Sequence, residues 1–194
     1  LQECGAAGCS TTERSMTLDA NWRWVHDANG YENCYKGKEW VDKFCTDPAK
    51  CASECALEAV SAAEYRSSYG ISEVPEGVEL KFVSKTQNGA NFGSRLYMMD
   101  SADSYFMFKL KNREFSLEVD ASKLPCGLNG AVYFVEMDQH GGKGKGGNEA
   151  GAKYGTGYRD AQCPHDRKFI DGEANSLRWN STAEPPTGPY GTCC

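Results

Sequence analysis

Two tryptophans two positions apart, Trp22 and Trp24, are the residues whose types and spacing best suggest a ligand site. They lie where apolar and polar residues alternate, which predicts a half-buried strand with both indoles on one face, about 7 Å apart. Indoles on one strand face belong to a core more often than to a ligand site. Here they alternate with Asn21, Arg23 and His26, and such polar company favours a site for sugar rings. The residues leave both alternatives open.

Ten cysteines in 194 residues indicate a disulfide framework and an oxidising compartment. Cys34, Cys51 and Cys55 could imitate a zinc cluster, but no matching Cys-x-x-Cys pair accompanies them and the histidines are isolated, so we predict no metal site. Asn180, within Asn-Ser-Thr, is an N-glycosylation acceptor, which fits a secreted, extracellular protein. The first residues lack the basic and apolar regions of a signal peptide, so we expect any such signal to have been removed.

The composition, with 40% hydrophobic and 25% charged residues, is that of one ordinary globular domain. A net charge of −6 without a basic stripe argues against nucleic acid and anionic lipid as partners. No apolar run is long enough to cross a bilayer, so we predict no membrane segment. The glycine-rich residues 141–147 lack the Gly-Lys-Ser/Thr ending of a phosphate-binding loop. After these exclusions, a neutral molecule is the expected ligand.

Segments of alternating polarity dominate the chain and predict an all-β sandwich. The stretch from Pro48 to Tyr69 differs, because it is rich in Ala, Glu and Ser. Pro48 at its start and Gly70 after its end predict one or two short helical turns. The predicted strands are separated by turn signals and cover residues 16–19, 21–26, 78–83, 94–99, 105–110, 114–120 and 130–137.

A series of short stretches then occurs in an order that resembles glycoside hydrolase family 7, the retaining cellulases that comprise cellobiohydrolases and endoglucanases. The resemblance runs from about Cys4 to Cys194. The stretches are residues 19–24, 33–35, 93–97, 124–131, 150–158, 160–164 and 168–170. The resemblance implies a concanavalin-like jelly-roll sandwich of two curved antiparallel sheets, with a glucan along the concave face.

The same resemblance implies a set of substrate-binding residues and no cofactor. Trp24 would stack on a sugar near the groove entrance, Trp22 on one deeper inside, and Trp40 is a third aromatic candidate. Residues that would direct hydroxyl-binding groups into the groove are Arg95, Asn129, Tyr133, Tyr158, Asp160, Gln162 and Lys168. For Arg95, Asn129 and Gln162 the alternative is a buried hydrogen-bond network between strands.

No catalytic residue is predicted within the chain. The family cleaves with a Glu-x-Asp-x-x-Glu strand after a Cys-Cys pair, because retention needs two carboxyl groups about 5–5.5 Å apart. Cys193 and Cys194 correspond to that pair, so the catalytic carboxylates are expected just beyond Cys194. Glu136-Met137-Asp138 imitates the start of the motif, but position 141 is glycine and the stretch matches a different strand. His140 and His165 are expected on the surface.

The resemblance also implies how the cysteines pair, which spacing alone leaves open. The implied pairs are Cys4–Cys9, Cys34–Cys55, Cys45–Cys51 and Cys163–Cys193. Arg159 stands where the family usually has a cysteine, so Cys194 loses its expected partner, and the usual partner of Cys126 lies far downstream. We therefore expect residues 1–194 to be a single domain that forms the N-terminal portion of a family 7 catalytic domain.

The predicted function is a secreted cellulase that hydrolyses β-1,4-glucosidic bonds with retention of configuration, acting as a monomer on cellulose or cello-oligosaccharides. The first alternative is a non-catalytic β-glucan-binding fragment. A second is a disulfide-rich structural or inhibitory module unrelated to sugar.

Overall fold

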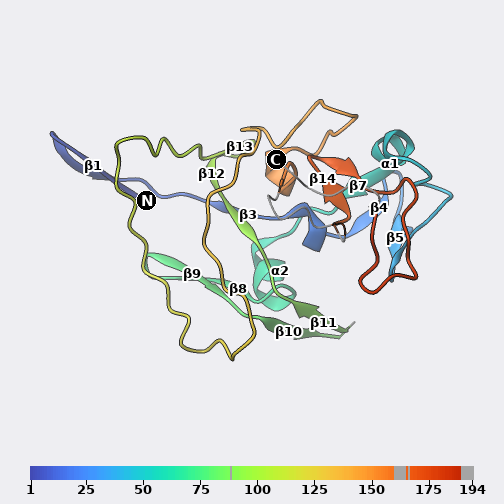
Figure 1. Cartoon of the computed structure of the whole chain (residues 1–194), viewed down its shortest axis with the longest axis horizontal. Coiled ribbons are helices and arrows are strands. Elements are labelled where there is room, and N and C mark those ends of the chain that lie inside the picture. Colours follow the sequence, from blue (N-terminus) through green and yellow to red (C-terminus); the bar gives the residue numbers. More distant parts are fainter. Residues whose placement is uncertain (88, 160–164, 166, 189–194) are drawn as a thin grey trace.

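The computed structural model describes residues 1–87, 89–159, 165 and 167–188. Asp160, Gln162, Cys163 and Cys193, named among the predicted site residues, lie outside the described residues. Short antiparallel strands dominate and the helices are few and short, which confirms the predicted all-β class (Figure 1). No helix in the described ranges is both long and apolar enough to span a membrane.

The strands of the first half are β1 Gln2–Gly5, β2 Gly8–Thr11, β3 Met16–Leu18, β4 Val25–Asp27, β5 Tyr35–Lys36, β6 Glu39–Trp40 and β7 Cys55–Leu57. Those that follow are β8 Ile71–Val74, β9 Gly77–Leu80, β10 Val83–Thr86, β11 Gly89–Phe92, β12 Leu96–Ser101, β13 Ser104–Tyr105, β14 Phe169–Ile170 and β15 Glu173–Ala174. The helices are α1 Pro48–Glu54 and α2 Ala62–Ser67, with 3-10 turns η1 Ala20–Trp22 and η2 Ala152–Tyr154.

A three-stranded sheet in the order β13–β12–β3 joins the start of the chain to its middle. In this sheet Leu96 lies opposite Leu18, and Met98 lies opposite Met16. Thr17 and Met99 lie on one face of this sheet and Leu18 lies on the other, and all three are buried, so both faces are covered here. The strands predicted at 16–19 and 94–99 are therefore confirmed.

A second unit forms where β4 pairs with β7 and α1 packs nearby. Its core gathers apolar residues from across the chain: Val25, Cys34, Trp40, Phe44, Cys45, Cys51 and Ala174. This core contains residues from the beginning and the end of the described chain, so it ties β15 to the N-terminal third.

The strand predicted at 21–26 is wrong in its first part. Asp19 accepts a hydrogen bond from the backbone N–H of Asn21 at 2.7 Å and thereby caps the 3-10 turn η1. The chain extends again only at β4, which begins at Val25. Trp22 therefore ends η1 and Trp24 lies between η1 and β4, so the two indoles do not share one strand face.

The helical turns predicted between Pro48 and Tyr69 are confirmed as α1 and α2. Pro48 lies in the first turn of α1, and the Asp47 side chain accepts from the N–H of Lys50. In α2 Ser61 and Glu64 form a reciprocal capping box.

The predicted strands at 105–110, 114–120 and 130–137 are largely wrong, because among the described residues only β13 reaches this part of the chain. From residue 106 to 138 the chain makes a long excursion without ladder partners (Figure 1). Its two arms meet through Phe108, Phe115 and Phe134, whose ring centroids lie 5.0–5.5 Å apart. A strand needs a neighbour for its backbone groups, and polarity alternation alone does not supply one.

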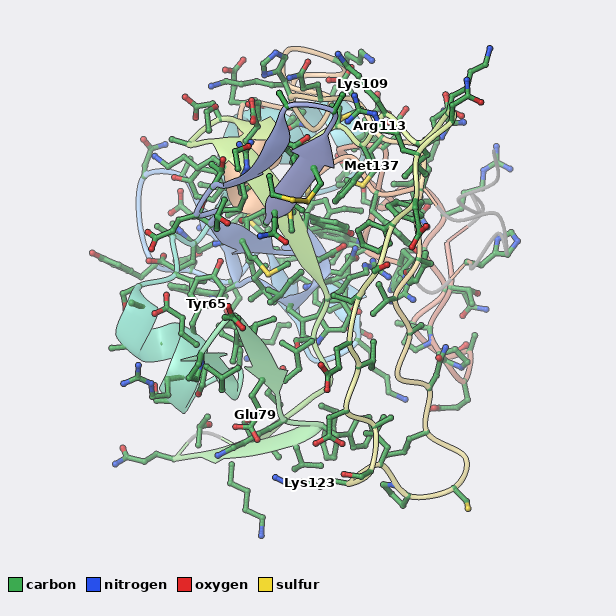
Figure 2. The ribbon with its side chains drawn as sticks, turned by 90° about the vertical axis from the view of Figure 1, so that its left-hand side faces the viewer. Tyr65, Glu79, Lys109, Arg113, Lys123 and Met137 are labelled. Atoms are coloured by element: carbon green, nitrogen blue, oxygen red, sulfur yellow. A yellow bond between two sulfur atoms is a disulfide. The ribbon has the colours of Figure 1, made fainter. Side chains whose placement is uncertain are left out.

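The excursion is held at its margins by weak surface ion pairs. Lys123 approaches Glu79 of β9 at 3.9 Å, and Arg113 approaches Glu3 of β1 at the same distance. Figure 2 shows Lys123 near Glu79 at one end of the molecule and Arg113 near Lys109 at the other. Exposed pairs of this kind contribute at most about 1 kcal/mol each.

Three of the implied disulfides are present: Cys4–Cys9, Cys34–Cys55 and Cys45–Cys51. Cys126 is free and exposed. The sulfur atoms of Cys45, Cys51 and Cys55 lie within 4.8 Å of one another, yet each belongs to a disulfide. Disulfide bonding therefore occupies the sulfurs that could have imitated a zinc cluster.

We expect the double substitution Cys34→Ala/Cys55→Ala to lower the free energy of unfolding by about 3 kcal/mol, because the bridge closes a 21-residue separation and Cys34 is fully buried. The matched control is Cys4→Ala/Cys9→Ala in a hairpin whose residues are all exposed, where we expect a much smaller loss. Urea unfolding of both variants measures the difference. Equal losses would contradict this account.

Candidate functional site

A fully buried carboxylate, Asp19, lies at the centre of the predicted site. Its Oδ2 accepts hydrogen bonds from Arg95 Nη2 at 2.7 Å, from Arg95 Nε at 3.1 Å and from the Tyr97 hydroxyl. Its Oδ1 accepts from the backbone and side-chain nitrogens of Asn21, at 2.7 and 2.9 Å. Every lone pair that such an anion offers is therefore matched by a donor, which is the condition for burying a charge.

Arg95 is held flat between aromatic rings by this carboxylate. Its guanidinium carbon lies 3.4 Å from the centroid of the Tyr158 ring and 5.5 Å from that of Trp22. Burial is the largest single influence and lowers the pKa of Arg95, but the charge and hydrogen bonds of Asp19 together with Tyr97 and Tyr158 outweigh it, so the pKa is raised. Arg95 therefore stays protonated and fixed in plane.

A hydrogen bond connects the buried Tyr158 to a more exposed tyrosine. The Tyr158 side chain is buried, and its hydroxyl lies 2.8 Å from that of Tyr133, which is 49% exposed. We refer to Trp22, Arg95, Tyr133 and Tyr158 as the Arg95 cluster. These four predicted residues, far apart in the sequence, are brought together by the fold.

Gly155 allows the strand-like segment after η2 to approach Asp19 closely. It takes a left-handed conformation with φ +74°, and its carbonyl accepts from the N–H of Ala20 at 3.0 Å. A Cβ at this position would lie 2.1 Å from the carbonyl oxygen of Leu18. Only glycine therefore permits the backbone contact that delivers Tyr158 to the cluster.

Lys168 contacts the C-terminal end of η1. Its ammonium donates to the carbonyl of Arg23 at 3.4 Å and stands 5.2 Å from the Tyr35 ring centroid. Desolvation lowers the pKa of Lys168 to about 8, although the negative charge of Asp19 opposes the shift. The N–H of Phe169 donates to the Asn21 side chain at 3.1 Å, which anchors this segment to η1.

Trp24 is half-buried and belongs to a different group of rings. Its Nε1 donates to the Asn33 side chain at 2.5 Å, and its ring centroid lies 4.6 Å from that of His26. The structure therefore separates Trp24 from Trp22, which the predicted common strand would have placed side by side.

The prediction that Trp40 contacts a sugar is wrong in this structure, because the side chain lies in the core with 7% exposure. It packs edge-on against Tyr35 and Phe169, at centroid distances of 5.0 and 5.8 Å. Asn129 lies exposed after the turn at Pro125–Leu128, and no hydrogen bond joins its side chain to a described residue.

Glu136 and Asp138 lie in different surroundings. Glu136 is exposed, whereas Asp138 binds Lys145 at 2.8 Å and accepts from the backbone N–H of His140. These two hydrogen bonds lower the pKa of Asp138. Asp138 therefore serves the turn that follows it. His140 and His165 are exposed, as expected.

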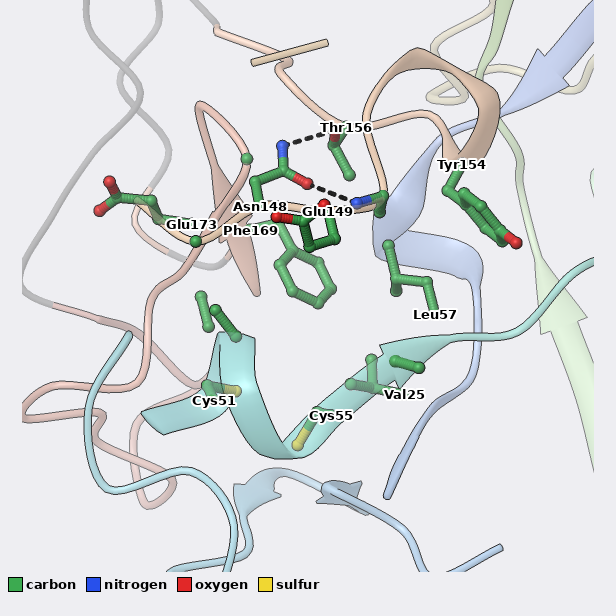
Figure 3. Close-up of a pocket in the computed structure, with 16 residues that line it drawn as sticks. Val25, Cys51, Cys55, Leu57, Asn148, Glu149, Tyr154, Thr156, Phe169 and Glu173 are labelled. Carbon is green, nitrogen blue, oxygen red and sulfur yellow. Dashed lines mark hydrogen bonds between the residues drawn. The ribbon is translucent and has the colours of Figure 1, made fainter. Parts of the chain in front are cut away.

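A cavity of about 250 Å³ lies between α1, β7 and the glycine-rich loop (Figure 3). Its walls are mainly apolar, and the polar atoms of Asn148 are engaged with Gly141, Thr156, Ala150 and Gly151. Glu149 and Glu173 also line it. None of the predicted sugar-binding residues that the structure describes lines this cavity, so we do not assign the glucan site to it.

Sequence reasoning missed Asp19 and Tyr97, although both lie inside the stretches that it singled out. Asp19 stands before a segment predicted as a strand, where nothing marks it as the partner of a residue 76 positions away. An aspartate at this position predicts that its side chain caps the following turn, and it does not predict a distant partner such as Arg95.

Comparison with known proteins places this architecture among carbohydrate-active enzymes. The family model for glycosyl hydrolase family 7 matches residues 1–194. A family 7 cellobiohydrolase from Daphnia pulex is 46% identical, with a TM-score of 0.90 over 97% of this chain and 43% of that one. A cellobiohydrolase from Melanocarpus albomyces, complexed with cellotetraose, is 40% identical with a TM-score of 0.82 over 99% and 44%.

A third similar structure, an endoglucanase I complexed with cellobiose, is 33% identical with a TM-score of 0.74 over 90% of this chain and 43% of that chain. The chain belongs to glycosyl hydrolase family 7. The jelly-roll fold implied by the resemblance is confirmed by these matches, and the chain spans less than half the length of these relatives.

We expect Asp19→Asn to lower the free energy of unfolding by about 3–5 kcal/mol, because it leaves the buried Arg95 charge without its partner. The control is Asp100→Asn, which loses an ion pair to Arg14 at a more exposed site and should cost less than about 1 kcal/mol. Chemical denaturation measures both. A loss at Asp19 no larger than that at Asp100 would show that the buried pair does not hold the site.

We expect Lys168→Met to stabilise the protein by about 1–3 kcal/mol below pH 8, where the folded state must bury a charged amine. The folded protein releases this proton near pH 8 and the unfolded chain near pH 10.5. Between these values the unfolded state binds more protons, so the stability of the unsubstituted protein rises with pH and the gap to Lys168→Met shrinks. Unfolding at pH 6.5 and at pH 9.5 tests this. A gap independent of pH would be the contrary result.

Proposed function

We propose that this chain forms the N-terminal, glucan-binding portion of the catalytic domain of a secreted cellulase that hydrolyses β-1,4-glucosidic bonds with retention. The observation that carries the proposal is the Arg95 cluster, in which a permanently charged fork lies between two aromatic rings. Relatives of this fold have been solved with cellotetraose and with cellobiose, which supports a cello-oligosaccharide as the ligand.

The cluster offers sugar-binding chemistry of two kinds. Arg95 spends its Nε and Nη2 on Asp19, whereas Nη1 donates to none of the described residues. Nη1 and the Tyr133 hydroxyl are thus donors for equatorial hydroxyls, and the half-buried Trp22 ring is a surface for a pyranose C–H face. We include Trp24, Asn129, Asp160, Gln162 and Lys168 in the proposed groove and leave Trp40 out.

Cleavage with retention needs two carboxyl groups, one as nucleophile and one as general acid and then base. We propose that these carboxylates follow Cys194, and that the residues of this chain bind and orient the glucan without taking part in proton transfer. The two-carboxylate mechanism requires no metal and no cofactor.

Secretion and a monomeric state are parts of the same proposal. Three disulfides support an oxidising compartment. Asn180 is exposed, and its side-chain oxygen accepts hydrogen bonds from the N–H and the hydroxyl of Thr182 at 3.1 and 2.8 Å. An exposed asparagine in this motif supports the proposal that its amide nitrogen carries a glycan.

In the full-length protein we expect Trp22→Ala to weaken the binding of cellohexaose by about tenfold, because one ring-stacking surface is lost. The control is Trp179→Phe, which alters an indole whose Nε1 donates to the Lys38 carbonyl, away from the Arg95 cluster. Quenching of tryptophan fluorescence in a stopped-flow instrument, read before hydrolysis, measures the affinity. Unchanged affinity in Trp22→Ala would count against the proposed groove.

The remaining candidate is a protein that binds glucan without cleaving it, which the lack of a carboxylate pair at Glu136 and Asp138 favours for the described residues taken alone. We expect the full-length protein to hydrolyse a soluble β-glucan and Glu136→Gln to keep its turnover within about twofold. Absence of turnover would favour the binding protein, and loss of turnover in Glu136→Gln would make Glu136 catalytic after all.

A further inference from the structure

Arg23, at the C-terminal end of η1, is a buried cation with 4% exposure. Among the described residues its guanidinium donates only to neutral oxygens, which are the carbonyls of Leu18 and Glu58, each at 3.1 Å, and the hydroxyls of Thr17 and Tyr65, at 3.0 and 3.3 Å. None of the ion pairs between described residues includes Arg23. Its hydrogen bonds are therefore largely satisfied, whereas its charge has no counter-charge beside it.

The Tyr65 hydroxyl, on α2, has a proton without an acceptor; Figure 2 labels this residue. Its oxygen accepts from the N–H of Leu18 at 2.9 Å and from Arg23 Nη2 at 3.3 Å. A hydroxyl has two lone pairs and one proton, so both lone pairs are engaged and no described residue takes the proton. One N–H on Arg23 Nη1 likewise has no acceptor among the described residues. Two neighbouring donors are thus available to a ligand.

Both residues line a cavity of about 190 Å³ between β3, β12, α2 and η2, and Lys153 of η2 lines it as well. The Arg23 guanidinium carbon and the Lys153 ammonium lie 5.5 and 5.8 Å from the centroid of the Tyr154 ring. Lys153 is exposed, and it forms no ion pair with a described residue. No acidic residue of the described chain lines the cavity, although the net charge is −6. The cavity therefore attracts an anion.

Much of the remaining wall is apolar, and its contributors are Met16, Ala59, Val60, Met99 and Ala102. The polar groups between them are engaged: the Thr17 hydroxyl donates to the carbonyl of Lys153 at 2.9 Å, and the Ser101 hydroxyl lies 2.8 Å from that of Ser104. A bare inorganic anion would leave these apolar walls uncovered. A ligand with one charged end and an apolar body matches both parts of the cavity.

We propose that this cavity, which we call the Arg23 pocket, binds a small monocarboxylate with an apolar body, such as an aromatic acid. The carboxylate accepts from the Tyr65 hydroxyl, from the remaining Arg23 N–H and from the Lys153 ammonium, and the body packs on Met16 and Met99. None of the four residues of the Arg95 cluster lines the pocket, so the inference adds a second ligand to the proposed function.

The first test compares three probes on the full-length protein by isothermal titration calorimetry near pH 7 and at low salt, where a carboxylic acid is ionised. We expect benzoate to bind with a Kd on the order of 1 mM. Benzyl alcohol keeps the ring without the charge, and acetate keeps the charge without the ring. Each should bind at least about tenfold more weakly than benzoate, because each satisfies only one part of the pocket.

The second test locates the bound benzoate with substitutions. We expect Lys153→Met to weaken benzoate binding about three- to fivefold, because one cation is lost from the pocket. The matched control is Lys85→Met, which removes the same charge from an exposed position on β10 that does not line the pocket and should stay within about twofold. Tyr65→Phe keeps the ring and removes the donor, and we expect a loss of about tenfold. The thermal midpoint of Lys153→Met should be unchanged at so exposed a position.

Any of four results would overturn the inference: no binding of benzoate, binding of benzyl alcohol or acetate as tight as that of benzoate, equal effects of Lys153→Met and Lys85→Met, or displacement of benzoate by cellohexaose, which would place it in the glucan groove. The lysine variants decide the matter even if Tyr65→Phe disturbs the fold, because Lys153 and Lys85 are both exposed. The proposed function stands or falls separately, on the binding of cellohexaose itself.

Discussion

The buried pairing of Asp19 with Arg95 is the interaction on which the rest of the site depends. Asp19 receives donors from two segments, because Asn21 belongs to η1 and both Arg95 and Tyr97 belong to the start of β12 or the residue before it. A charge this deep is tolerated only when its partners are all in place. The ion pair therefore fixes the position of the N-terminal part of the chain relative to its middle part. It also fixes the plane of the guanidinium.

The chemistry of the surface follows from that fixed plane. A guanidinium whose carbon lies 3.4 Å from the Tyr158 ring centroid keeps its charge and loses rotational freedom, and its Nη1 donates to no residue that the structure describes. The Trp22 ring centroid lies 5.5 Å from the guanidinium carbon and the Tyr133 hydroxyl 2.8 Å from that of Tyr158, so the cluster combines apolar ring faces with hydrogen-bond donors. This combination suits a neutral, hydroxyl-rich chain better than an anion, because Asp19 already neutralises the one cation at its centre.

The sequence predicted the all-β class, the short helices and the strands at β3 and β12, because these depend on local alternation and on caps such as Ser61 and Glu64. It failed at residues 21–26, where the Asp19 cap overrides the alternation, and at 106–138, where the described residues supply no neighbouring strand. Trp40 was misplaced because core and ligand-binding indoles look alike in sequence.

The most direct test of the central claim is a crystal structure of the full-length protein with cellohexaose bound. We predict a pyranose face packed on the Trp22 ring and a sugar hydroxyl within hydrogen-bond distance of Arg95 Nη1, with the Asp19–Arg95 pair unchanged. An oligosaccharide bound elsewhere, with Trp22 uncovered and Arg95 Nη1 in contact with protein or water alone, would contradict the account.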